Sequence, residues 1–230
     1  MEEVRMNIRG FQKVSLVDFP GVICTTVFTG GCNFRCGYCH NRELVLNPGN
    51  LPKYDKSEIL QYLVKCTGKI DGVCITGGEP TLQKDLTPFI KQIKALGLKV
   101  KLDTNGTNPE KLEELIALKL LDYVAMDIKA PLHRYYLVAG VRCEAGKIQK
   151  SIEILAGSGI EHEFRTTLVP LLTEGDIFEI REMIPKERYV LQQFRVTNTL
   201  IDPALQDMAP WPPEMVKKIA AVVNAVVRGA

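Results

Sequence analysis

The chain has 230 residues, of which 46% are hydrophobic and 24% are charged. These values are ordinary for a globular protein and predict one domain with a sizeable core. The formal net charge of +2 is too small to predict binding to nucleic acid or to a membrane surface. No apolar run resembles a secretory signal or reaches the length of a membrane span, so we expect a cytoplasmic protein that binds neither nucleic acid nor membrane.

Short β-rich runs alternate with amphipathic helical patterns along the chain. Strands are predicted at residues 22–28, 73–76, 99–102, 123–128, 164–169 and 189–193. Helices are predicted at residues 55–66, 86–96, 109–119, 147–156, 176–184 and 213–227. Gly97 stands where the second helix should end in a left-handed residue. This alternation predicts an α/β fold with parallel strands and crossover helices.

The number of strand–helix units points to an incomplete barrel. Six units fall short of the eight in a complete barrel, which takes about 250 residues, so we expect a partial (β/α)6 TIM-like barrel. We interpret residues 1–230 as one domain, in which residues 1–21 form a lead-in and residues 195–230 a C-terminal loop and helix. Polar motifs at residues 30–39, 77–80, 103–106 and 127–129 follow the first four strands, where barrels of this kind carry their chemistry.

The first of these motifs holds three cysteines in a C-x3-C-x2-C spacing, at Cys32, Cys36 and Cys39. Three thiolates on one loop can bind three irons of a [4Fe–4S] cluster and leave the fourth iron open. A structural zinc site that adds His40 is the alternative, although zinc motifs usually pair two C-x2-C elements and this chain has only one. The remaining cysteines are interpreted as small buried apolar residues: Cys24, Cys66, Cys74 and Cys143.

With Tyr38 before its last cysteine, this loop resembles the signature of the radical S-adenosylmethionine (SAM) enzymes. The resemblance implies that the open iron binds the amino and carboxylate groups of SAM. It also implies that one electron from the reduced iron–sulfur cluster cleaves SAM into methionine and a 5′-deoxyadenosyl radical. The GGEP sequence at residues 77–80 matches the motif that binds the SAM amino group, which implies cofactor-binding roles for Gly77, Gly78 and Glu79.

Two further motifs, DTNG at residues 103–106 and D-x-K at residues 127–129, resemble elements of glycyl-radical activating enzymes related to pyruvate formate-lyase activase. The resemblance implies that Asp103 and Asp127 bind a monovalent cation beside the SAM carboxylate. It also implies that Asn105 belongs to the cofactor site and that Lys129 lies at the catalytic centre. A cation is physically reasonable, because two facing carboxylates repel one another.

Arg165 interrupts an apolar strand, and a buried guanidinium needs an anionic partner. Two kinds of partner are open. One is SAM, through its carboxylate or its ribose region, which would make Arg165 a cofactor-binding residue. The other is an ion pair with Glu161, Glu163 or another acid of the barrel.

Residues 10–21 and 28–41 resemble the activating proteins of anaerobic ribonucleoside-triphosphate reductase. This resemblance implies abstraction of a hydrogen from a glycine Cα of that partner, with flavodoxin or ferredoxin as the electron donor. Three alternatives remain open. They are a pyruvate formate-lyase-type activase, a small-molecule enzyme similar to 7-carboxy-7-deazaguanine synthase, and a non-catalytic protein with a structural Cys3His zinc.

Overall fold

The computed structural model describes residues 6–184 and 188–229. Its contacts divide the chain into two compact units. Unit 1 contains the chain up to Asn33, Glu43–Thr104 and Glu110–Val124, and unit 2 contains Phe34–Arg42, Asn105–Pro109 and the chain from Ala125 onward. The predicted cysteine loop is shared, because Cys32 belongs to unit 1 whereas Cys36 and Cys39 belong to unit 2.

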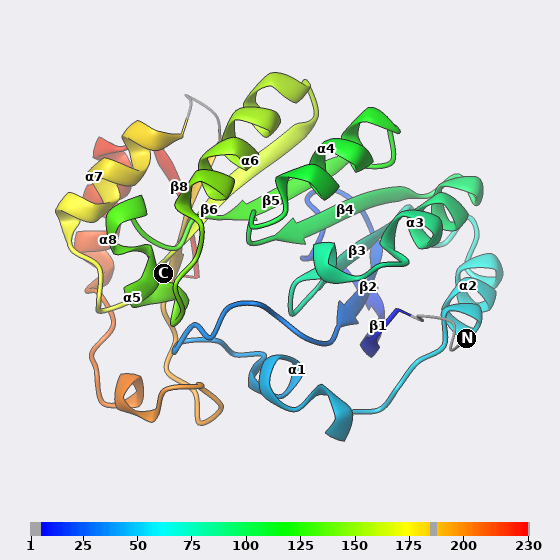
Figure 1. The fold of residues 1–230 in the computed structure, drawn as a ribbon, viewed down its shortest axis with the longest axis horizontal. Coiled ribbons are helices and arrows are strands. Elements are labelled where there is room, and N and C mark those ends of the chain that lie inside the picture. The colour runs from blue at the N-terminus through cyan, green and yellow to red at the C-terminus, as the bar shows by residue number, and fades with distance from the viewer. Residues whose placement is uncertain (1–5, 185–187, 230) are drawn as a thin grey trace. The chain divides into compact units, whose positions relative to one another are not determined.

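Unit 1 is a sheet of neighbouring strands in chain order (Figure 1). Its strands are β1 (Ile8–Ser15), β2 (Cys24–Thr29), β3 (Gly72–Gly77) and β4 (Lys99–Thr104). β1 runs antiparallel to β2, and the later pairs are parallel. The helical segments assigned wholly or mostly to this unit are α1 (Arg42–Leu46), η1 (Pro48–Asn50), α2 (Lys56–Lys65), η2 (Pro80–Leu82), α3 (Leu86–Ala95) and α4 (Pro109–Ala117).

Local sequence explains why these elements form. Asp55 caps α2 in a reciprocal capping box with Glu58. Gly97 follows the end of α3 with a φ of +78°, as predicted for a left-handed residue. β3 is buried over most of its length and reads as a continuous apolar run, which is typical of a strand in a parallel sheet. The core of the unit contains Val27, Ile75 and other side chains that neighbouring strands contribute.

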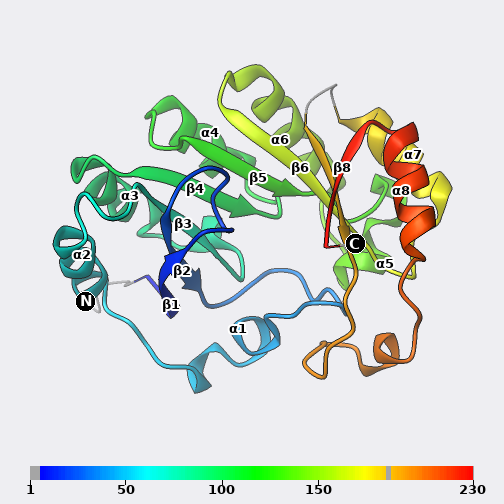
Figure 2. The ribbon, with the colours of Figure 1, turned by 180° about the vertical axis from the view of Figure 1, so that it is seen from behind.

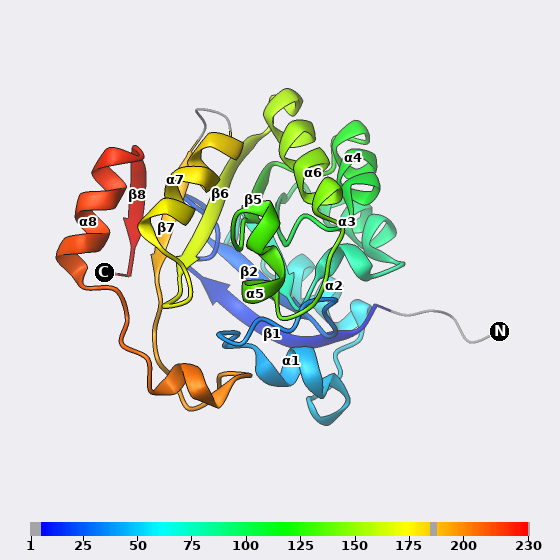
Figure 3. The same ribbon diagram turned by 60° about the vertical axis from the view of Figure 1, so that its left-hand side comes forward.

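Unit 2 contains a second parallel set of strands, β6 (Glu161–Leu168), β7 (Tyr189–Gln193) and β8 (Ala225–Arg228), drawn in Figure 3. Its helical segments are η3 (Leu132–Arg134), α5 (Tyr135–Ala139), α6 (Ala145–Ser158), α7 (Glu174–Met183), η4 (Pro203–Gln206) and α8 (Pro213–Val222). The strand β5 (Tyr123–Asp127) gives Tyr123 and Val124 to unit 1 and its later residues to unit 2. Residues that the motifs place after β5 therefore belong to unit 2.

The predicted strands and helices are all present, with ends that differ by a few residues. One prediction at the end of the chain is wrong, because the last helix ends at Val222 rather than at residue 227. The lead-in contains the strand β1, which was not predicted. Asn224 adopts a left-handed φ of 52° and turns the chain, so that the β-branched Val226 and Val227 pair with β7 in β8, seen beside α8 in Figure 2.

The short helices α1 and α5 were also not predicted. None of the helices in the described ranges combines the length and the apolar character that crossing a membrane requires.

Candidate functional site

The GGEP turn follows β3 in unit 1 and packs against backbone. Gly78 N–H donates to the Thr29 carbonyl at 2.8 Å, and Glu79 N–H donates to the Gly31 carbonyl at 2.9 Å. A Cβ at Gly78 would collide with the Gly31 carbonyl, and a Cβ at Gly77, whose φ is +116°, would collide with the Thr29 backbone. Both glycines are therefore required by the close approach of the turn to the segment that leads into Cys32.

Glu79 places a buried carboxylate in this turn, with only 1% of the residue exposed. Its Oε1 accepts hydrogen bonds from Thr81 N at 3.1 Å, Thr81 Oγ1 at 2.6 Å and Thr104 Oγ1 at 2.8 Å. Burial of a carboxylate is tolerated only with such partners, and they fix its orientation. The sequence prediction included Glu79 but missed Thr81 and Thr104, whose only sequence signal was their position inside the EPT and DTNG strings.

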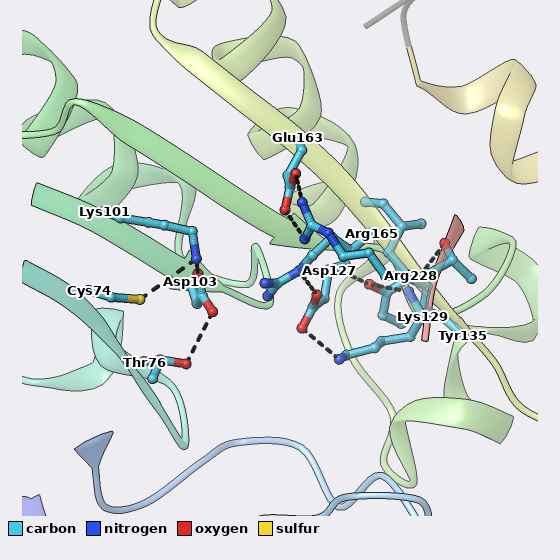
Figure 4. A network of polar contacts seen from close by, with 12 residues as sticks. Cys74, Thr76, Lys101, Asp103, Asp127, Lys129, Tyr135, Glu163, Arg165 and Arg228 are labelled. Carbon is cyan, nitrogen blue, oxygen red and sulfur yellow. Dashed lines mark hydrogen bonds and ion pairs between the residues drawn. The ribbon is translucent and has the colours of Figure 1, made fainter. Parts of the chain in front are cut away.

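Asp103, the second-last residue of β4, has an internal cationic partner that the sequence reasoning missed. Lys101 Nζ forms an ion pair with Asp103 Oδ1 and donates to Cys74 Sγ at 3.7 Å. Thr76 Oγ1 donates to the other carboxylate oxygen at 3.3 Å. Figure 4 shows the lysine and the aspartate pointing toward one another along β4. The sequence did indicate this pair, because Lys101 lies between two apolar residues and two positions before Asp103. Residues two apart in a strand lie on the same face.

Asn105 and Gly106, the second half of the DTNG motif, lie in unit 2 and form a turn. The Asn105 side-chain oxygen accepts from Thr107 N at 3.0 Å and from Thr107 Oγ1 at 2.7 Å. Gly106 has a φ of +74°, and Ser151 Oγ of α6 donates to its carbonyl at 2.8 Å. These contacts show a structural role for the side-chain oxygen of Asn105, and its predicted role at the cofactor stays a prediction.

The D-x-K motif brings three of the predicted site residues into contact. Asp127 Oδ1 accepts from Arg165 Nε at 2.8 Å, and Asp127 Oδ2 accepts from Lys129 Nζ at 3.1 Å (Figure 4). The side chains of Arg165 and Lys129 are both mostly buried. The sequence left SAM and a protein acid open as partners of Arg165. The structure shows an ion pair with a protein acid, Asp127.

Charge pairing fixes the ionisation of this group. Burial alone would raise the pKa of Asp127, but Arg165 and Lys129 outweigh it and lower the pKa to about 2. Burial alone would lower the pKa of Lys129, but Asp127 outweighs it and raises the pKa well above its ordinary value. Both groups are therefore charged at neutral pH, and Lys129 is a fixed positive charge rather than a base.

The second half of the cysteine loop lies beside this group in unit 2. Cys39 N–H donates to the Cys36 carbonyl at 3.0 Å, which closes a turn with Gly37 and Tyr38 at its centre. Lys129 Nζ lies 5.5 Å from the centroid of the Tyr38 ring, within the range of a cation–π interaction. The Tyr38 hydroxyl is buried and has no hydrogen-bond partner in the part of the chain that the structure describes.

Burial raises the pKa of the Cys36 thiol to about 11, with Lys129 acting in the opposite direction, and burial also raises the pKa of Cys39. Thiols in such surroundings become thiolates when a metal binds them, and the ammonium of Lys129 favours that change. Residues 6–184 and 188–229 contain no group of three His, Cys, Asp or Glu side chains arranged to hold a metal ion. The ligand set of Cys32, Cys36 and Cys39 thus stays a prediction.

Of the other cysteines, only Cys74 belongs to a group described above, as an acceptor of the Lys101 ammonium. Cys24 is fully buried, as is Cys74, and both match the prediction of small apolar residues. Cys66 and Cys143 are only half-buried. His40, the fourth ligand in the zinc alternative, is exposed, and partial burial together with Arg195 lowers its pKa.

Glu163 was considered as a partner for Arg165 but pairs elsewhere. Its fully buried carboxylate accepts from both terminal nitrogens of Arg228 in β8, at 2.6 and 2.7 Å, and lies 3.5 Å from Arg188 Nε. This bidentate pair connects β6 to the strand that the sequence analysis read as helix.

Comparison with known sequences agrees with these motifs. A family model described as the Radical SAM superfamily matches residues 26–184. A protein of Methanocaldococcus jannaschii named as a glycyl-radical enzyme activating enzyme is 35% identical over 81% of this chain and 79% of its own length. The pyruvate formate-lyase-activating enzyme of Clostridium pasteurianum is 30% identical over 82% of this chain and 77% of its own length.

Solved structures show the same fold at low sequence identity. Streptococcus suis SuiB bound to S-adenosylmethionine has a TM-score of 0.67 at 15% identity and covers 87% of this chain, which spans about half (48%) of that protein. A domain of pyruvate formate-lyase-activating enzyme from Bacteroides vulgatus has a TM-score of 0.55 at 19% identity, covering 69% of this chain and 99% of that domain. The predicted class, α/β with parallel strands in a partial TIM-like barrel, is confirmed.

Proposed function

Because this chain belongs to the radical SAM superfamily and, within it, to the activating enzymes of glycyl-radical enzymes, we propose that it generates a glycyl radical on a partner protein. The superfamily implies a [4Fe–4S] cluster and bound SAM. When bound, the iron–sulfur cluster supplies the electron that cleaves SAM to methionine and a 5′-deoxyadenosyl radical, and the radical takes a hydrogen from a glycine Cα of the partner.

In this proposal Cys32, Cys36 and Cys39 are the ligands of the iron–sulfur cluster. The carboxylate of Glu79, whose Oε1 is oriented by Thr81 and Thr104, would bind the amino group of SAM. The buried Tyr38 hydroxyl supports a cofactor beside the cysteine loop, because an unpaired buried hydroxyl costs free energy until a ligand satisfies it.

The observation that carries the proposal is the contact between the D-x-K motif and the cysteine loop within unit 2. Lys129 pairs with Asp127 on one side and lies over the ring of Tyr38 on the other. A fixed positive charge at this point favours the anionic cysteine thiolates and attracts the anionic carboxylate of SAM. Arg165 is a second cation paired with Asp127, so the three side chains of Asp127, Lys129 and Arg165 carry a net positive charge.

For the partner we propose anaerobic ribonucleotide reductase, with flavodoxin or ferredoxin as the electron donor. The lead-in at residues 10–21 and the sequence at residues 28–41 support this partner. Pyruvate formate-lyase is the second candidate, and the 30% identity to the activating enzyme of Clostridium pasteurianum favours it.

The test is anaerobic. Protein reconstituted with iron and sulfide is reduced in the presence of SAM and either candidate partner, and 5′-deoxyadenosine and the electron paramagnetic resonance (EPR) spectrum are measured. We expect 5′-deoxyadenosine with either partner and the doublet of a glycyl radical with ribonucleotide reductase. A doublet only with pyruvate formate-lyase would select the second candidate. Bound zinc that survives air, with no cleavage of SAM, would overturn the proposal.

A further inference from the structure

Lys101 is a buried lysine on β4, two residues before Asp103. Only 3% of the residue is exposed, and its register partner in β3, Cys74, is fully buried. A lysine at such a position needs a permanent anionic partner, because an isolated ammonium is costly to remove from water. Asp103 is that partner, and Cys74 Sγ at 3.7 Å is a further acceptor.

The direction of the side chain matters for what the pair can do. Lys101 and Asp103 are two residues apart on β4 and share one face of the strand, so the ammonium reaches the carboxylate along the strand (Figure 4). The ammonium of Lys101 thus places a positive charge at the C-terminal end of β4, beside Asp103. Thr76 from β3 donates to the second carboxylate oxygen and fixes the orientation of Asp103.

The resemblance implied a monovalent cation beside Asp103 and Asp127, and the repulsion between two carboxylates made such a cation physically reasonable. Within unit 1 the charge of Asp103 is balanced by Lys101, and within unit 2 the charge of Asp127 is balanced by Arg165 and Lys129. These aspartates differ from the ligands of a metal-cation site, because each carboxylate already forms an ion pair with a lysine or arginine side chain. Each carboxylate therefore has its negative charge compensated within its own unit.

We propose that Lys101 is a built-in counter-ion that takes the place of a monovalent metal cation at Asp103, so that SAM binding is independent of Na⁺ and K⁺. This inference rests on the proposed function only in requiring that SAM binds near Asp103. Lys101 acts through Asp103 and is therefore a positioning residue rather than a catalytic one.

The experiment measures equilibrium binding of SAM to the anaerobically reconstituted protein in buffers whose only monovalent cation is Na⁺, K⁺ or choline. Choline is too large to enter a site built for a metal ion. We expect the dissociation constant of the wild type to differ by less than about twofold between the buffers. In Lys101→Met, Asp103 loses the ammonium beside it, so SAM should bind about tenfold or more weakly in choline, and Na⁺ or K⁺ should restore binding.

Two further variants make the result specific to this position. Lys101→Arg keeps the charge and should stay independent of the cation. Lys99→Met removes an exposed lysine from the same face of β4 and should behave as the wild type, so it controls for net charge. Weaker binding by the wild type in choline would overturn the inference even if Lys101→Met does not fold. Equal, cation-independent binding by Lys101→Met and the wild type would also overturn it.

The two proposals fail in distinguishable ways. A wild type that binds SAM only with a metal cation contradicts the role of Lys101 and leaves the proposed function standing. A wild type that binds no SAM in any buffer overturns both.

Discussion

Removing Arg228 should destabilise the protein, because it leaves the carboxylate of Glu163 buried without its bidentate partner. Two charge-assisted hydrogen bonds at 2.6 and 2.7 Å are lost in Arg228→Met. Each such bond is worth about 1.5–3 kcal/mol. Two facts reduce the sum: Arg188 still lies 3.5 Å from Glu163, and the Arg228 side chain is 35% exposed, so water can replace part of the interaction. We therefore expect a loss of about 3 kcal/mol in the free energy of unfolding.

The assay is urea unfolding at neutral pH, followed by far-ultraviolet circular dichroism, with the same iron content in every sample. The matched control is Lys217→Met, which removes a pair with Glu214 at 3.6 Å whose side chains are 63% and 89% exposed. That variant should lose no more than about 0.5 kcal/mol. In the double variant Glu163→Leu/Arg228→Met, part of the lost stability should return, because the buried carboxylate that had lost its bidentate partner is itself removed. A loss in Arg228→Met as small as that of the control would refute the reasoning.

Four further outcomes are expected. Cys36→Ala should abolish iron binding measured by colorimetric assay, whereas Cys74→Ala should leave iron stoichiometry unchanged; a loss of iron in the second variant would mean that the ligand set is wrong. Asp127→Asn should weaken SAM binding about tenfold in equilibrium dialysis while the iron–sulfur absorbance is retained, and loss of that absorbance would contradict the assigned role. The pKa of Asp127 falls from 3.8 to about 2 on folding, so its ionised form should contribute about 2 kcal/mol to the free energy of unfolding. This contribution is present above pH 3.8 and is lost as the pH falls toward 2, which urea unfolding midpoints measured at stepped pH can show. Gly78→Ala should lower the iron content although it lies outside the cysteine loop, and unchanged iron would show that residue 31 can move aside.

Much of the α/β pattern could be read from the sequence because parallel strands and their helices carry strong local signals. β3 contains the continuous apolar run 73–75, and Gly97 marks the end of α3. The strand β8 could not be read in the same way, since its valines continue the apolar pattern of α8 and only the backbone of Asn224 separates them. β1 lacks regular alternation between buried and exposed residues, because irregularities interrupt its pairing with β2.

The candidate site was predicted as a set of residues, and its internal pairing was not. The D-x-K motif named Asp127 and Lys129, and the interrupted apolar strand named Arg165, but a sequence does not tell which acid pairs with which base when several are available. Lys101 escaped notice because a single lysine in a strand is usually read as a solvent-facing residue. Its partner lies on the same strand, so a check of residues two apart for opposite charge would have found it.

The contact between Gly78 and Gly31 has a consequence for protein engineering. One hydrogen bond, from Glu79 N–H to the Gly31 carbonyl, joins the GGEP turn to the entry of the cysteine loop, and no Cβ at Gly78 fits between them. Neither segment can therefore be grafted alone onto another scaffold, because each supplies the surface against which the other takes its shape. A transplant of this chemistry has to move β2, β3 and both turns as one piece.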